Sequence, residues 1–178
     1  MLILKKNNYF QQNINDEIVI RTLTEEDVTQ DYVDGINDNA VNLYLVGARI
    51  KNQTFDDVRS FVRLNENDKH GHLFGLFIDN ILRGTCRLHE ITELSAYLGI
   101  AIFDRSIWGK SYGTSLIQAV SHFGIRSLNL KRIEALIHEE NVASIKAFEK
   151  ANFITDDSKN ELKSGVQYRY FVYNGLQQ

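Results

Sequence analysis

The chain has 178 residues, of which 43% are hydrophobic and 24% are charged, and its formal net charge is -3. This composition is typical of a globular protein. The chain is long enough for one domain, or one domain with an appendage, to bury a hydrophobic core. The net negative charge argues against a nucleic-acid binder, which needs a basic face.

Strand and helix signals alternate in the first half of the chain. A first strand is predicted over Ile18–Leu23, and Thr24 with the acidic residues after it predicts a helix to about Asn37. Thr54 begins a second helix with one expected inward face: Phe55, Val58, Phe61, Val62 and Asn65. Two strands joined by a tight turn at Asp79-Asn80 follow, over His72–Ile78 and Ile81–Glu90.

The second half begins with Ser95–Phe103, whose nearly continuous apolar sequence predicts a central strand covered on both faces. A helix over Ser111–Ser127 and a strand over Arg132–His138 follow. The remaining predicted elements are a helix over Asn141–Ala151 and late strands over Phe153–Thr155 and Gln167–Tyr173. This order predicts a mixed α/β sheet rather than a doubly wound fold.

The ends of the chain and its cysteine bear on domain organisation and compartment. We expect a single domain over residues 1–178, with the polar residues 1–15 loosely ordered. Cys86 is the only cysteine, which excludes an intramolecular disulfide and a multi-cysteine zinc site, and its strand pattern predicts a buried side chain. The N-terminal MLILKKNNYF is the reverse of a signal peptide. We therefore expect a cytoplasmic protein with no metal and no membrane association.

The segment between Ser95–Phe103 and the next helix carries the strongest chemical signal. It reads Asp104-Arg-Ser-Ile-Trp-Gly-Lys-Ser-Tyr-Gly-Thr114. Glycines let main-chain N–H groups approach a ligand, and the first turn of a helix supplies unpaired N–H groups and the positive end of its dipole. Lys110 adds a mobile positive charge. Together these features predict an anion site suited to phosphate.

Other interpretations compete for this loop. A nucleotide P-loop needs a glycine where Asp104 stands, and a carboxylate there would repel phosphate. A dinucleotide fingerprint needs three glycines after the first strand, whereas this loop has two and lies late in the chain. On the loop alone, an ordinary helix start that contains glycine stays open.

Two segments together resemble the GNAT acyltransferases, especially the branch that contains the ribosomal-protein N-terminal acetyltransferases. The first is Trp108-Gly109-Lys110-Ser111-Tyr112-Gly113-Thr114. The second is Asn141-Val142-Ala143-Ser144, followed by Glu149-Lys150-Ala151-Asn152-Phe153. The resemblance spans about Ile18 to Tyr173 and implies the GNAT acyl-CoA N-acyltransferase fold. In that fold a mixed, mostly antiparallel central sheet is flanked by helices, and its fourth and fifth strands splay apart.

Three positions depart from the family pattern. Ser111 replaces the first glycine of the loop motif, and its Cβ narrows the approach to a pyrophosphate. Asn152 replaces the glycine after the second motif helix, where Asn is the next-best residue for left-handed backbone. Tyr97 stands where many relatives carry a glutamate, two positions before Gly99.

The resemblance implies acetyl-CoA as co-substrate and assigns residues to it. Main-chain atoms of the central strand would contact its acetyl and pantetheine groups, the loop amides would hold its pyrophosphate, and Asn141 would cap a helix and face the pantetheine. The implied cofactor-binding residues are Ile100, Ala101, Ile102, Trp108, Gly109, Lys110, Ser111, Tyr112, Gly113, Thr114 and Asn141.

For catalysis, the resemblance aligns Ser144 with a residue that often protonates the departing thiolate. The candidate bases are His138 and Glu139, at the end of one strand, and Glu90, at the end of another. An α-amine has an ordinary pKa of about 7.7–8.0 and needs little help to lose a proton, whereas a lysine side chain needs far more. The weak base candidates therefore favour an α-amine or an amino sugar as acceptor.

The implied function is an acetyl-CoA-dependent N-acetyltransferase that transfers acetyl to a primary amine by direct attack in a ternary complex. The acceptor is a small molecule, an amino-sugar nucleotide or a protein N-terminus, and the protein is a monomer or a homodimer. A non-catalytic GNAT-like domain that binds acyl-CoA or a partner is the alternative. The first two helices and the late strands should build the acceptor pocket, near which lie Tyr32, Tyr44, His70, His72, Tyr168 and Tyr170.

Overall fold

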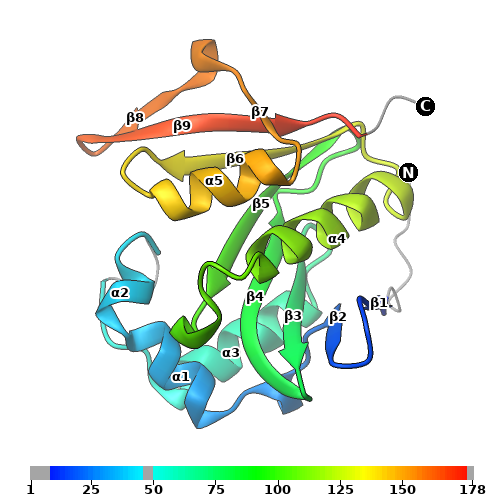
Figure 1. Cartoon of the computed structure of the whole chain (residues 1–178), viewed down its shortest axis with the longest axis vertical. Helices are drawn as coiled ribbons and strands as arrows, with labels where there is room; N and C mark the ends of the chain where they lie inside the picture. Colours follow the sequence, from blue (N-terminus) through cyan, green and yellow to red (C-terminus); the bar gives the residue numbers. More distant parts are fainter. Residues whose placement is uncertain (1–8, 46–49, 176–178) are drawn as a thin grey trace.

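The computed structural model describes residues 9–45 and 50–175 of the chain. Within these residues the strands form one nine-stranded sheet in the order β1-β2-β3-β4-β5-β6-β9-β7, with β8 also paired to β9 (Figure 1). The strands are β1 (Gln11–Asn13), β2 (Ile18–Thr22), β3 (His72–Ile78), β4 (Ile81–His89), β5 (Ser95–Ile102), β6 (Arg132–His138), β7 (Ile154–Thr155), β8 (Glu161–Lys163) and β9 (Val166–Tyr173). Only the β5–β6 pairing among them is parallel, so the expected mixed, mostly antiparallel sheet is confirmed.

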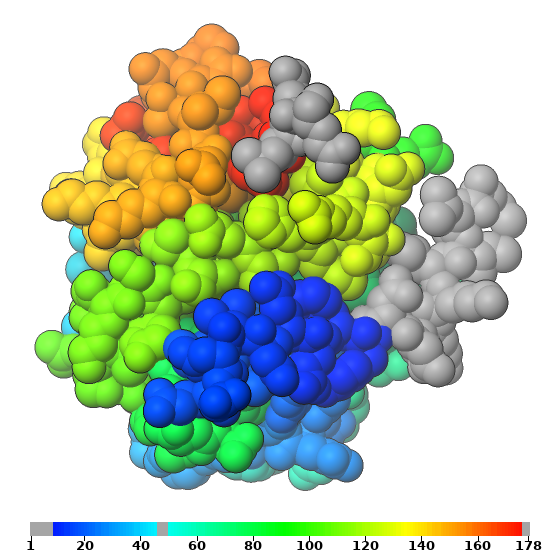
Figure 2. Space-filling model, turned by 45° about the vertical axis from the view of Figure 1, so that its right-hand side comes forward, coloured from blue at the N-terminus to red at the C-terminus, as the bar shows by residue number. Residues whose placement is uncertain are grey.

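Helices cover both faces of this sheet. On one face, a buried cluster joins α1 (Gln30–Asn37), α2 (Asn39–Asn42) and α3 (Phe55–Glu66) to β3 and β4. On the other face, a larger cluster joins α4 (Tyr112–Arg126) and α5 (Val142–Lys150) to the centre of the sheet. Figure 2 shows α4 as a yellow-green band between the C-terminal segment, in orange and red, and the N-terminal strands, in blue.

The helix expected from Thr24 to Asn37 is broken in two. A short 3-10 turn over Glu25–Asp27 comes first, Val28 is extended, and α1 begins after Thr29, whose hydroxyl accepts the N–H of Tyr32 at 3.3 Å. The two threonines each begin a separate element. Arg21 on β2 holds Asp27 through Nη1 at 2.8 Å, which keeps the first turn against the sheet.

Several other expectations need correction. Gln11–Asn13 forms β1, paired with β2, although residues 1–15 were expected to be loosely ordered; residues 1–8 lie outside the described part of the chain. The strand β8 and the short helix α2 were not predicted. On α3, Phe55 and Phe61 are 39% and 41% exposed, so only the other expected inward residues of that helix are buried.

Two predicted turns are confirmed. Asp79 and Asn80 both have positive φ, 51° and 63°, as the two-residue hairpin between β3 and β4 requires. Asn152 has φ 67° directly after α5, the left-handed position for which Asn is the best substitute for glycine. In the described residues, no helix combines the length and the apolar character needed to cross a membrane.

Candidate active site

The sheet opens between its two central strands. The parallel strands β5 and β6 pair only at Ser95↔Arg132, Ala96↔Ile133 and Tyr97↔Glu134, after which they diverge (Figure 1). Meanwhile β5 stays paired with β4 as far as Ile102, and β6 stays paired with β9 as far as His138. The inner edges of both strands are therefore left without a neighbouring strand along the opening.

The main chain of β5 presents two residues to this opening. The N–H of Phe103 donates to the carbonyl of Arg83 on β4 at 3.2 Å, which fixes the alternation of the antiparallel ladder. By that alternation, the N–H and C=O groups of Ile100 and Ile102 point away from β4 towards the opening. Those of Ala101 point to β4, and its side chain packs beside the cluster under α1 and α3.

The loop after β5 is anchored on three sides. The Trp108 indole Nε1 donates to the carbonyl of Ile102 at 2.9 Å. Arg83 Nη1 lies 2.7 Å from the Asp104 carboxylate. Asp104, the residue that is incompatible with a P-loop, therefore supports the loop through an ion pair. Arg105 lies 3.4 Å from Asp38, the residue that caps α2. These contacts fix the start of α4 relative to β5.

The amides at the start of α4 are unpaired. The first main-chain bond of this helix runs from the N–H of Ser115 to the carbonyl of Ser111 at 3.1 Å. In the part of the chain that the structure describes, the N–H groups of Ser111, Tyr112, Gly113 and Thr114 have no acceptor. A 15-residue helix directs its positive dipole end at the same place.

Glycines keep this helix start open. A Cβ on Gly109, which has φ 76°, would meet nothing within 4 Å. A Cβ on Gly113 would meet only the side chains of Ile100 and Ile102, at 3.6 Å, so the helix start lies over the half-buried end of β5. Ser111 itself is left-handed, with φ 67° and ψ 7°, and its hydroxyl does not cap the helix. Free amides beside a solvent-open glycine fit the phosphates of a coenzyme.

The start of α5 supplies a second polar edge. The Asn141 side chain accepts the N–H of Ser144 at 3.1 Å, an N-cap of the usual type. Ser144 is half-buried on the first turn, and its hydroxyl has no hydrogen-bond partner among the described residues. The hydroxyl is therefore free to donate to a ligand.

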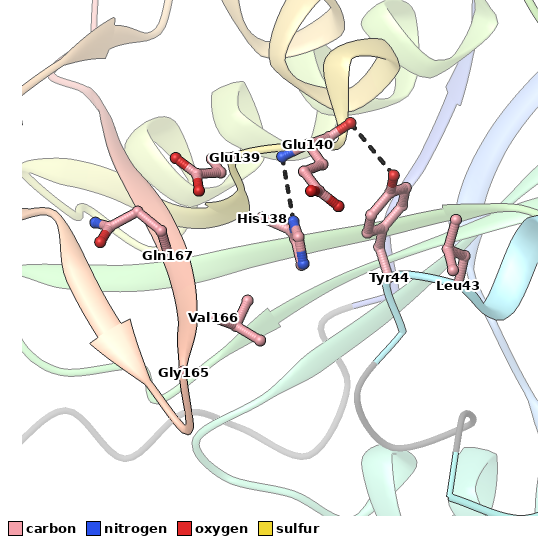
Figure 3. Close-up of a pocket in the computed structure, with 8 residues that line it drawn as sticks. All are labelled: Leu43, Tyr44, His138, Glu139, Glu140, Gly165, Val166 and Gln167. Atoms are coloured by element: carbon pink, nitrogen blue, oxygen red, sulfur yellow. Dashed lines mark hydrogen bonds between the residues drawn. The ribbon is translucent and has the colours of Figure 1, made fainter.

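A cavity of about 320 Å³ lies at the end of β6. Its lining comes from the segment after α2, the end of β6 with the turn that follows it, and the β8–β9 turn with the start of β9: Leu43, Tyr44, His138, Glu139, Glu140, Gly165, Val166 and Gln167 (Figure 3). The Tyr44 hydroxyl donates to the carbonyl of Glu140 at 3.3 Å, which links the segment after α2 to the β6–α5 turn. Residues of the late strand β9 line the cavity as expected, but none of the lining residues belongs to the two early helices predicted from the sequence; Leu43 and Tyr44 lie between them.

His138 is the central side chain of the cavity. Its ring lies 4.9 Å from that of Tyr44 and 5.8 Å from that of Tyr168. Its Nδ1 accepts the N–H of Glu140 at 3.2 Å, so in the neutral ring the proton is on Nε2, the nitrogen directed away from Glu140 in Figure 3. In this arrangement His138 presents a hydrogen-bond donor to the cavity.

The other base candidates are separated. Glu139 lines the cavity beside His138. Glu90 lies instead where β4 ends, 73% exposed, with its carboxylate 3.4 Å from Nδ1 of His89. This is the closed end of the opening, since His89 pairs with Tyr97 and Tyr97 with Glu134. The structure therefore brings together two of the three candidates.

A buried polar network, which the sequence did not predict, lies at this closed end of the opening. Glu134 is 7% exposed, and its Oε1 accepts from the Tyr170 hydroxyl at 2.6 Å and from Arg132 Nε at 2.8 Å. Burial raises the pKa of the Glu134 carboxyl, but bonds from Arg132 and Tyr170 outweigh it and leave the pKa below its ordinary value. Burial and the bond to Glu134 raise the pKa of Tyr170. The sequence signal was Glu134 between the apolar residues Ile133 and Ala135 of β6.

The expected acceptor-side residues divide into two groups. Tyr44 and Tyr168 lie around His138. The other four lie elsewhere. Tyr32 is buried against Phe103, and Tyr170 donates to Glu134. His70 contacts the carbonyl of Ile91, and His72 packs beside Phe74 and Phe123 on the α4 side. Of the expected residues, only Tyr44 lines the cavity, and Tyr168 supports it through the His138 ring.

Comparison with known proteins relates the chain to a family of acetyltransferases. The model of the acetyltransferase (GNAT) domain matches residues 17–154. The chain is 34% identical over 82 residues to the uncharacterized N-acetyltransferase p20 of Bacillus licheniformis, a match that covers 43% of this chain and 46% of that protein. It is 25% identical over 165 residues to the uncharacterized N-acetyltransferase YoaA of Bacillus subtilis (strain 168), covering 90% and 88% of the two chains.

Among solved structures, the ribosomal L7/L12 alpha-N-protein acetyltransferase RimL, in complex with coenzyme A, superposes with a TM-score of 0.79. The alignment covers 93% of this chain and 98% of that one at 16% identity. At this identity the likeness establishes the fold and leaves the acceptor open.

Proposed function

Because the chain belongs to the GNAT family of acetyltransferases, we propose that it is an N-acetyltransferase that takes the acetyl group from acetyl-CoA and transfers it to a primary amine. The observation that carries this proposal is the set of unpaired amides at Ser111–Thr114 beside the unpaired edge of β5. The unpaired amides suit phosphate groups, and the unpaired edge of β5 suits an extended chain that carries amide groups.

The residues proposed to hold acetyl-CoA follow the order of the opening. In the loop Trp108–Thr114, the amides of Gly109 and of Ser111–Thr114 would bind the pyrophosphate, with the Lys110 side chain as a mobile cation. The amides of Trp108 and Lys110 already donate to the carbonyls of Arg105 and Ile107. Ile100 offers its N–H and C=O groups to the pantetheine and Ile102 its N–H, since the Ile102 carbonyl already accepts from Trp108, and Asn141 borders the opposite side. When bound, acetyl-CoA supplies an activated acetyl group.

The proposed reaction is direct transfer in a ternary complex. In this reaction, a main-chain N–H on the unpaired edge of β5 would stabilise the negative charge that develops on the acetyl oxygen. We propose that the Ser144 hydroxyl returns a proton to the leaving sulfur, since that hydroxyl is free and lies at the start of α5. Each of these roles uses a group with no competing partner among the described residues.

Proton removal from the amine needs little assistance if the acceptor is an α-amine, because its ordinary pKa of about 7.7–8.0 leaves a useful neutral fraction near pH 7. His138 is better suited to orienting the acceptor through Nε2–H than to taking its proton, since its Nδ1 is occupied by Glu140. Glu139 and Glu90 stay as candidate bases. The cavity around His138 would hold the remainder of the acceptor.

Titration calorimetry with CoA and acetyl-CoA, followed by a thiol-release assay over a panel of primary amines, tests this function. We expect CoA binding and amine-dependent thiol release. A chain that binds no CoA at millimolar concentration would contradict the proposal. Binding without turnover on any amine would favour the non-catalytic alternative, which Ser111 in the loop and the absence of a carboxylate at Tyr97 keep open.

A further inference from the structure

Gly99 is an exposed residue in the middle of a central strand. Its strand β5 lies between β4 and β6 in the nine-stranded sheet, and the preceding residue, Leu98, is only 4% exposed. Gly99 itself is exposed, and a Cβ built on it would meet nothing within 4 Å among the described residues. Among residues 9–45 and 50–175, nothing therefore covers one face of the strand at this position.

The fold gives no reason for glycine here. Glycine in a strand interior loses side-chain packing and adds chain entropy to the unfolded state. At Gly75 on β3 and Gly84 on β4, glycine is explained by crowding, because a Cβ would come within 2.6 Å of Phe77 and Ile102, respectively. Gly99 has neither such a neighbour nor a positive φ. A close approach by a ligand is the remaining physical reason for a strand glycine.

The position of this space relates it to the opening. Gly99 is the second residue after Tyr97, the last β5 residue paired with β6, and it directly precedes Ile100, whose main chain points into the opening. The alternation of the strand directs a side chain at 99 to the same face as Tyr97 and Ala101, the face covered by α1 and α3. The start of α4 lies over the opposite face, against the Ile100 and Ile102 side chains.

We propose that the space above Gly99 is the passage by which the acceptor amine reaches the acetyl group, and that the missing side chain sets how much bulk is tolerated next to the amine. This inference rests on the proposed function. The coenzyme would occupy the α4 side of β5, and the primary amine would arrive from the α1 and α3 side. The groups on the amine-bearing carbon would then pass over Gly99 and extend to the cavity at His138.

The test adds carbon atoms at this one position. Gly99→Ala and Gly99→Val are compared with the wild-type chain by CoA titration, by thermal unfolding, and by kcat/KM for two acceptor types, an unbranched alkylamine and an amino-acid amide. We expect the CoA dissociation constant to change less than twofold and Tm to stay level or rise. We expect kcat/KM of Gly99→Val to fall at least tenfold, and to fall further for the amide, whose amine-bearing carbon is branched.

Gly84→Ala is the matched control, since its Cβ collides with Ile102 and should lower Tm, whereas Gly99→Ala should not. A tenfold loss of CoA affinity in Gly99→Val would assign the space to the coenzyme and overturn the inference, as would unchanged kcat/KM for both amines. In either case the proposed function stands. A wild-type chain that binds no CoA would overturn the proposed function and this inference with it.

Discussion

The indole Nε1 of Trp108 donates to the carbonyl oxygen of Ile102 at 2.9 Å, so the loop before α4 is fastened to the strand that borders the opening. The same carbonyl belongs to a residue whose main chain faces away from β4. The side chain of Trp108 thus positions the amides of the loop relative to the edge of β5.

Trp108→Phe removes this hydrogen bond and keeps an aromatic ring. A neutral hydrogen bond is worth about 0.5–1.5 kcal/mol net, so we expect CoA affinity to fall roughly threefold to tenfold. Titration calorimetry measures the change. Replacement of the exposed Leu162 by alanine, on β8, is the control and should leave CoA affinity unchanged. Equal CoA affinity in Trp108→Phe and wild type would show that the loop does not depend on this contact.

Ser111→Gly should tighten CoA binding or leave it unchanged. Ser111 has φ 67°, a conformation that costs an L-residue roughly 1–2 kcal/mol and glycine almost nothing, and the change also removes a Cβ from the phosphate approach. Calorimetry and thermal unfolding should show no loss of affinity and no drop in Tm. A tenfold weaker affinity would reveal the Ser111 side chain as a ligand. Ser111→Ala separates the hydroxyl from the backbone effect.

Asn141→Ala and Ser144→Ala should separate stability from turnover. Loss of the cap at Asn141 should lower the free energy of unfolding by about 0.5–2 kcal/mol. Ser144→Ala leaves the capped N–H in place and should change stability by less than about 0.5 kcal/mol, while lowering kcat roughly a hundredfold if its hydroxyl protonates the sulfur. Denaturant unfolding and steady-state kinetics give the two readouts. Unchanged kcat in Ser144→Ala would remove Ser144 from the mechanism.

Tyr170→Phe removes a buried hydrogen bond to the Glu134 carboxylate. A hydrogen bond to a charged group is worth about 1.5–3 kcal/mol, so unfolding in denaturant should show a loss of that order. Tyr168→Phe is the matched control, two residues away on the same face of β9, and should change stability by less than about 0.5 kcal/mol. A loss below about 0.5 kcal/mol in both variants would mean that the other partners of Glu134 hold it without Tyr170.

Stability should decline as the pH falls below about 6.5. Burial lowers the pKa of His72, so the unfolded chain binds a proton on this side chain that the folded chain rejects. The contribution of neutral His72 to the free energy of unfolding is fully present above the ordinary histidine pKa of about 6.5. It is lost as the pH falls through the lower pKa of His72 in the folded chain. Burial also lowers the pKa of His89 and of His122, with the same sign.

Thermal unfolding between pH 7.5 and 5.5 measures this slope. His72→Phe keeps a ring beside Phe74 and Phe123 but cannot titrate, so its Tm should fall less steeply with decreasing pH than that of the wild-type chain. Equal slopes would place the pH dependence on other groups.

Features that depend on near neighbours in the chain could be predicted from the sequence. The cap at Thr54, the hairpin at Asp79-Asn80 and the left-handed Asn152 each follow from the chemistry of a few consecutive residues. The break at Val28 was missed although α1 begins at a second N-cap of its own, Thr29. The contact of Arg21 on β2 with Asp27 joins a strand to the turn after it, and the residues around Val28 alone do not predict it.

The same limit applies to the site. The loop amides and the Asn141 cap were found from sequence because one segment supplies each of them. The partnership of Glu134 with Tyr170, and the contact between Tyr44 and the β6–α5 turn, join residues 36 and 96 positions apart. The proton position on His138 likewise follows from a main-chain N–H that only the folded turn directs at Nδ1.

The short pairing of β5 with β6 has a thermodynamic consequence. Only three residue pairs of β5 and β6 join the β1–β5 part of the sheet to the part that contains β6 and β9. A ligand between the diverging strands would add contacts to both parts. Any molecule that binds only the folded chain stabilises it by mass action, by about 2.7 kcal/mol when its concentration is a hundred times its dissociation constant. Typical domains are stable by only about 5–15 kcal/mol. The abundance of folded protein would therefore follow the supply of any ligand that binds in this opening.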